Sequence, residues 1–126
     1  MNIQDLNNMY DIEKCEKIEN ESGAIYIGES TAEKSVGYLE LKPHSSLPLH
    51  KREGGIENLI QVKGECVMIV FESPEGTNHK LNKGDELRIE PLGVLHIHSN
   101  PFDTISLSYW HFEGDIRKVI EEIRNK

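Results

Sequence analysis

The sequence predicts an all-β domain, a sandwich or a barrel, that ends in one α-helix. Short runs rich in β-branched and aromatic residues recur from residue 24 to residue 112, and each run ends in residues typical of turns. The end of the chain instead repeats apolar side chains at helical spacing. About eight short strands joined by short connections, with almost no helix among them, are typical of a sandwich or barrel.

The strands are expected within residues 24–112, and residues 1–23 precede them as an N-terminal extension. Turn sequences such as KPHSS, SPEGTN, NKGD and SNPFD separate the runs. In chain order, the runs are AIYIG, SVGYLELK, ENLIQVKG, ECVMIVFES, HKLNKGD, ELRIEP, VLHIHS and DTISLSYWHF.

Residues 113–126 are expected to hold the C-terminal helix. Asp115 is a favourable N-cap, and an apolar stripe follows it at i, i+3, i+4 and i+7. The stripe consists of Ile116, Val119, Ile120 and Ile123. Because such a stripe must be buried, we expect it to pack on the outer wall of the barrel, with a second subunit as the alternative.

Length and charge narrow the classes of protein that this chain can represent. Its 126 residues fit a single domain, and its net charge of −8 without any basic block argues against binding to nucleic acid or to an anionic membrane. The N-terminus lacks the features of a signal peptide, and no run of apolar residues is long enough to span a bilayer. Cys15 and Cys66 form no CxxC pattern, so we expect two free thiols in a cytoplasmic protein.

A polar site is expected inside the barrel. Strand alternation puts Glu57 on the same face as Gln61, and it puts His96 on the same face as His98. A carboxylate and imidazoles that converge in a barrel interior are costly to desolvate without a compensating partner. A divalent cation and a positively charged side chain can each serve as that partner.

Part of the sequence resembles the first motif of the cupin family, G(x)5HxH(x)3-4E(x)6G. His50, Glu57 and Gly64 match its first histidine, its glutamate and its last glycine. Arg52 stands where the motif has its second histidine, and the opening glycine has no clear counterpart.

The second cupin motif, G(x)5PxG(x)2H(x)3N, is matched in its PxGxxHxxxN part. Pro91, Gly93, His96 and Asn100 occupy its four fixed positions, although the interval from Gly84 is one residue longer than in the motif. The resemblance spans about residues 36–112. It implies a double-stranded β-helix, the jelly-roll barrel of the cupins, which the C-terminal α-helix expected from the apolar stripe follows, and it implies a homodimer.

The resemblance also implies a metal site. The ligands would be His50, Glu57 and His96, and such a set can hold Fe, Mn, Ni or Zn in the divalent state with open positions. Arg52 cannot be a ligand, because a guanidinium stays protonated and only donates hydrogen bonds. His98 is expected to line the pocket, or alternatively to replace the missing imidazole.

The remaining residues of the expected ligand-binding pocket are Arg52, Gln61 and Tyr109. Arg52 would clamp a carboxylate or phosphate of the ligand. Two alternatives stay open for this arginine: it pairs with Glu57 in a metal-free pocket, or it points to solvent at the mouth of the barrel. Tyr109 and Trp110 point to opposite faces of their strand, so one of the two faces the interior.

Three functions follow from these features. The first is a small metal-dependent enzyme, an isomerase, epimerase or dioxygenase, that acts on an anionic or sugar-like small molecule. The second is a metal-free, non-catalytic module that binds or senses a small molecule, and Arg52 is the residue that favours it. In the third, the interior has no function of its own and the exposed surface acts in an assembly.

Overall fold

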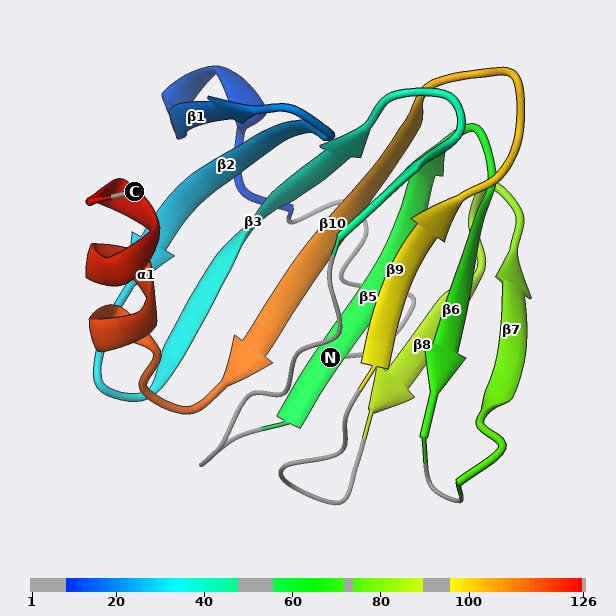
Figure 1. Cartoon of the computed structure of the whole chain (residues 1–126). Helices are drawn as coiled ribbons and strands as arrows, with labels where there is room; N and C mark the ends of the chain where they lie inside the picture. The colour runs from blue at the N-terminus through cyan, green and yellow to red at the C-terminus, as the bar shows by residue number, and fades with distance from the viewer. Residues whose placement is uncertain (1–8, 48–55, 72–73, 90–95, 126) are drawn as a thin grey trace.

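The computed structural model describes residues 9–47, 56–71, 74–89 and 96–125. These residues form two antiparallel sheets that face each other, followed by one α-helix (Figure 1). The elements in chain order are the 3-10 helix η2 (Ile12–Lys14), β1 (Glu16–Asn20), β2 (Gly23–Ser30), β3 (Lys34–Leu41), β4 (Ser45–Ser46), β5 (Ile56–Lys63), β6 (Cys66–Val70), β7 (Thr77–Leu81), β8 (Glu86–Ile89), β9 (His96–Asn100), β10 (Ser106–Glu113) and α1 (Arg117–Arg124).

The two sheets differ in width. The larger has the strand order β1-β2-β3-β10-β5-β8, and the smaller has the order β4-β9-β6-β7. Each of the eight predicted runs contains a strand, which confirms the predicted all-β class. β1 and the two-residue β4 were not predicted, and β1 lies within the segment expected to be an N-terminal extension.

The main core lies between the two sheets. Strand alternation turns every second residue of β5 and β6 inward, so that Leu59 packs with Cys66, Met68 and Val70. Leu81 of β7 and Ile89 of β8 complete this cluster. The smaller sheet therefore covers the half of the larger sheet that contains β10, β5 and β8.

A second core lies on the outer face of the larger sheet, beneath the N-terminal segment. Tyr38 and Tyr109 are paired across β3 and β10, and their ring centroids lie 4.9 Å apart. The hydroxyl of Tyr38 donates a hydrogen bond to the carbonyl oxygen of Tyr10 at 2.6 Å. The backbone N–H of Tyr10 in turn donates to the Tyr109 hydroxyl at 3.3 Å, so these contacts hold residues 9–15 on the sheet.

The helix α1 covers the inner face of the larger sheet beside the smaller sheet (Figure 1). Ile116 and Ile120 pack there against Ile27 of β2 and Phe112 of β10. The apolar stripe is thus buried against the barrel, but on the inner face of the sheet rather than on the expected outer wall. The physical reason is that the larger sheet has six strands and the smaller only four, which leaves inner-face side chains for the helix to bury.

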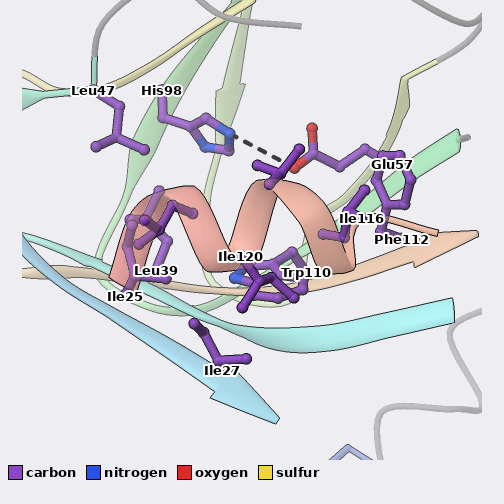
Figure 2. A pocket seen from close by; sticks show the side chains of 12 residues that line it. Ile25, Ile27, Leu39, Leu47, Glu57, His98, Trp110, Phe112, Ile116 and Ile120 are labelled. Carbon is purple, nitrogen blue, oxygen red and sulfur yellow. Dashed lines mark ion pairs between the residues drawn. The ribbon is translucent and has the colours of Figure 1, made fainter. Parts of the chain in front are cut away.

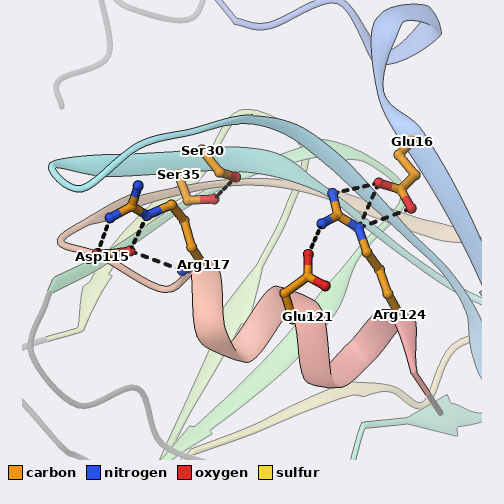
Figure 3. Close-up of polar contacts among 7 residues, drawn as sticks. All are labelled: Glu16, Ser30, Ser35, Asp115, Arg117, Glu121 and Arg124. Atoms are coloured by element: carbon orange, nitrogen blue, oxygen red, sulfur yellow. Dashed lines mark hydrogen bonds and ion pairs between the residues drawn. The ribbon is translucent and has the colours of Figure 1, made fainter.

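Polar contacts position both ends of α1 (Figure 3). Asp115 accepts hydrogen bonds from the backbone N–H and the guanidinium of Arg117, although the helix starts one residue later than an N-cap at Asp115 would place it. Arg124 contacts Glu121 and pairs with Glu16 of β1, with 2.7 Å between Nη2 and Oε1. No helix in the described part of the chain is both long and apolar enough to cross a membrane.

Candidate metal centre and adjoining pocket

A carboxylate of the larger sheet faces two histidines of the smaller sheet across the barrel interior. Glu57 lies on β5, and His96 and His98 lie on β9. The burial of β9 alternates, because His96 and His98 are buried while Ile97 between them is only half-buried. The period of two residues in a β-strand thus turns both imidazoles toward Glu57.

The three side chains form one buried cluster. His96 Nε2 lies 2.8 Å from Glu57 Oε2, and His98 Nε2 lies 3.9 Å from Glu57 Oε1. The two imidazole rings meet edge to face with their centroids 5.4 Å apart. One ligand atom from each residue lies within 4.8 Å of the others, and all three residues are buried.

The chemistry of this cluster fits a divalent metal ion. Two imidazoles and one carboxylate are the donor types that Zn, Fe and Mn sites use. Metal–ligand bonds of about 2.1 Å place neighbouring donor atoms about 3.0–3.4 Å apart. The observed separations of 2.8 and 3.9 Å fall on either side of that range, so small side-chain movements would suffice to hold an ion.

An apolar pocket extends from the cluster toward α1, with Glu57 and His98 at one end (Figure 2). Its volume is about 50 Å³. The described residues that line it are Ile25, Ile27, Leu39, Leu47, Glu57, His98, Trp110, Phe112, Ile116, Val119, Ile120 and Ile123. The inner face of the larger sheet forms one wall of the pocket, and the apolar stripe of α1 forms the other.

Trp110 lines the pocket, and Tyr109 does not. Tyr109 lies on the outer face of the sheet with Tyr10 and Tyr38, so its predicted place in the pocket is corrected. Alternation along β10 turns Trp110 inward. Its ring lies directly against Gly37 of β3. A Cβ added at position 37 would lie only 2.4 Å from a carbon of the Trp110 ring.

Gln61 is buried in the barrel but does not line this pocket. Its amide nitrogen donates to the Lys63 carbonyl oxygen and to Ser106 Oγ, and its amide oxygen accepts from Ser108 Oγ and Cys66 Sγ. All hydrogen-bonding positions of its side-chain amide are therefore used within the barrel, and its predicted role in ligand binding stays a prediction. Burial also raises the pKa of the Cys66 thiol to about 11.

Asn100, the last residue of the second motif, has a structural role. Its side-chain nitrogen donates to the carbonyl oxygens of Leu41, Lys42 and Thr104, and its side-chain oxygen accepts from the Phe102 backbone N–H. These bonds tie the turn after β9 to the end of β3. They hold in place the strand that carries His96 and His98.

Two predicted site residues, His50 and Arg52, lie outside the described residues. Of the predicted metal ligands, the structure brings Glu57 and His96 together, and it adds His98, which was expected mainly to line the pocket. The contribution of α1 to the pocket was not anticipated. Its stripe showed that the helix is buried, but nothing in the sequence indicated that it packs beside Glu57.

Comparison with known proteins finds similarity in structure only. No family model matches the sequence, and no curated protein matches it. Oxalate decarboxylase from Bacillus subtilis, a protein with Mn(II) centres, matches with a TM-score of 0.74 at 23% identity over 84% of this chain and 29% of that chain. The capsular polysaccharide assembling protein CapF from Staphylococcus aureus matches with a TM-score of 0.70 at 18% identity, over 79% of this chain and 30% of that chain.

An oxalate oxidase also matches, with a TM-score of 0.59 at 20% identity over 64% of this chain and 42% of that chain. The present chain thus spans less than half the length of each of these proteins. All three are cupin-fold proteins. Because the matches extend over most of this all-β chain, it has the fold of the cupins.

Proposed function

We propose that this chain binds a divalent metal ion through Glu57, His96 and His98 and holds a small molecule in the adjoining pocket. The observation that carries the proposal is the buried cluster, whose ligand atoms lie within 4.8 Å of one another. Burying a carboxylate beside two imidazoles is costly, and a cation offsets that cost. The Mn(II) centres of the matched oxalate decarboxylase support the same reading.

A bound divalent ion would act as a Lewis acid toward an oxygen of the small molecule. Glu57 would balance part of its charge, and the two imidazoles would bind it in their neutral form. His50 is proposed as a further ligand, and Arg52 as the partner of an anionic group of the substrate. An isomerase, epimerase or dioxygenase is the corresponding enzyme class, with Mn, Fe, Ni or Zn as the metal.

The alternative is a metal-free module that binds a small molecule without catalysis. The distance of 2.8 Å between His96 Nε2 and Glu57 Oε2 favours it, because a close polar contact between the two side chains also offsets part of the cost of burying the carboxylate. Both candidates use the same pocket. They differ in whether a cation is required.

A metal titration with a matched pair of variants separates the two candidates. Protein purified without chelator is analysed for metal content, stripped and titrated with Mn²⁺ by calorimetry. We expect binding near one ion per chain and at least a tenfold loss of affinity in Glu57→Gln, which removes a ligand charge but preserves shape. Glu113→Gln is the control, since this half-buried glutamate pairs with Arg88 elsewhere on the larger sheet. Absence of Mn²⁺ binding, or equal affinity in all three proteins, would favour the metal-free module.

A second pair of variants tests the assignment of His98. His98→Ala should weaken Mn²⁺ binding, whereas His44→Asn should not, because His44 is exposed and pairs with Asp103 away from the cluster. Asparagine suits position 44, where the backbone has a φ of 57°. Unchanged affinity in His98→Ala would limit this histidine to lining the pocket.

We also propose that the chain is a cytoplasmic homodimer, as the cupin resemblance and the composition suggest. Sedimentation velocity at micromolar concentration tests the dimer, for which a mass of about twice 14.4 kDa is expected.

A further inference from the structure

The walls of the pocket limit the chemistry of its ligand. Of the described residues that line it, all except Glu57 and His98 are aliphatic or aromatic. Burial of apolar ligand atoms against such walls is favourable in proportion to the area covered. A polyhydroxylated ligand would instead lose hydrogen bonds to water that the described walls cannot replace.

The polar end of the pocket indicates the charge of the ligand. Glu57 carries one negative charge, and imidazoles bind metal ions in the neutral form. A divalent ion held by Glu57, His96 and His98 therefore leaves one net positive charge among these described groups. One monoanionic head group neutralises that charge, whereas the second carboxylate of a dianion such as oxalate would lie against the apolar walls.

The size of the pocket indicates the length of the apolar part. Its volume is about 50 Å³. One water requires about 10–15 Å³ of cavity volume, so about three to five water-sized groups fit. An unbranched chain of about three to five carbons has that size.

We propose that the ligand is a short aliphatic monocarboxylate of about four to six carbons. Its carboxylate lies at the metal end beside Glu57 and His98, and its hydrocarbon tail lies between α1 and the inner face of β2, β3 and β10. The helix is then a specificity-determining element, since Val119 and Ile123 form the wall against which the tail packs. This inference rests on the proposed metal site.

The test is the dependence of affinity on chain length in the Mn²⁺-loaded protein. Acetate, butyrate, hexanoate and octanoate are titrated by calorimetry, with oxalate as the dianion. We expect the dissociation constant to fall about threefold to fourfold for each added methylene up to hexanoate, because each buried methylene contributes that factor. The gain should end at octanoate, and oxalate should bind more weakly than butyrate.

A substitution in the wall tests the contribution of α1. Val119→Thr places a hydroxyl in the pocket and should weaken hexanoate binding at least threefold while leaving acetate and Mn²⁺ affinities unchanged. Val62→Thr is the matched control, since this half-buried valine packs with the cluster on the outer face of the larger sheet. It should change none of the three affinities.

The outcomes distinguish the ligand class from the metal site. Equal affinities for acetate, butyrate and hexanoate in protein that binds Mn²⁺ would overturn the ligand class alone, and so would tighter binding of oxalate than of butyrate. Equal effects of Val119→Thr and Val62→Thr on hexanoate would overturn the position of the tail. Failure to bind Mn²⁺ would refute the proposed metal site itself, and the inference that rests on it.

Discussion

Replacing Gly37 by alanine should displace the only tryptophan of the chain from its position in the pocket wall. A Cβ at this position would lie 2.0 Å from the carbonyl oxygen of Tyr26 and 2.4 Å from a ring carbon of Trp110. The carbonyl belongs to the β2–β3 pairing, so the two strands must separate locally to relieve the first contact, and the Trp110 ring must move to relieve the second. Gly37 has no positive φ, and the cost of the substitution is therefore steric.

The size of the effect follows from these contacts. Overpacking of a buried site costs about 1–3 kcal/mol, and both contacts are short enough to place Gly37→Ala in the upper half of that range. For a chain of 126 residues, each kcal/mol lowers the melting temperature by about 4 °C. We expect a decrease of about 8–12 °C.

Thermal unfolding followed by tryptophan fluorescence measures both consequences in one experiment. The native emission spectrum of Gly37→Ala should differ from that of the wild type, because Trp110 is the only indole that contributes. Gly84→Ala is the control: its φ of 92° strains an alanine, but no atom lies within 4 Å of the added Cβ. The control should lose some stability and keep the native spectrum. An unchanged melting temperature and spectrum in Gly37→Ala would refute the packing of Trp110 on β3.

Three further predictions concern the core, the helix and the surface. Burial raises the pKa of the Cys66 thiol to about 11, so the folded state keeps a proton that the unfolded state loses from pH 9. The free energy of unfolding should therefore fall between pH 9 and 11, by up to about 2–3 kcal/mol. Urea unfolding across that pH range measures this loss, which should be smaller in Cys66→Ala. Ile120 is buried, and Ile120→Ala should lower the free energy of unfolding in urea by about 2–5 kcal/mol. Lys118→Ala on the exposed face of the helix should change it by less than about 0.5 kcal/mol. Equal effects of the two substitutions would contradict the docking of α1. A double-mutant cycle on Arg124 and Glu16 should give only a weak coupling that decreases further with salt, because the pair is exposed; a strong, salt-independent coupling would contradict this expectation.

The strands with strong local patterns were predictable from the sequence. β5, β6 and β10 alternate apolar and polar residues or form short apolar runs between turns, and that information is local. β1 was missed because its sequence, EKIEN, is mostly polar, and its strand conformation depends on pairing with β2 at the edge of the sheet. β4 has only two residues, too few to produce any pattern.

The candidate site was predictable only in part. Glu57 and His96 were identified because the cupin motifs name their positions, and alternation placed His98 on the same face as His96. Alternation could not decide whether Tyr109 or Trp110 faces inward, because both are large aromatic residues on one strand. Gln61 was expected to bind the ligand because it shares a strand face with Glu57. Its partners Ser106 and Ser108 could not be foreseen, because they lie more than 40 residues away in the sequence.

The docking of α1 has a consequence for how the pocket can be opened. The helix has only eight residues, and an isolated helix of that length is not stable in water. Its folding and its burial of Ile116 and Ile120 are thus a single event, and one wall of the pocket exists only while that event persists. A molecule that contacts this wall shifts the local unfolding equilibrium by mass action. Amide hydrogen exchange in residues 117–124 should therefore slow in proportion to occupancy, so that the C-terminus reports binding in the barrel interior.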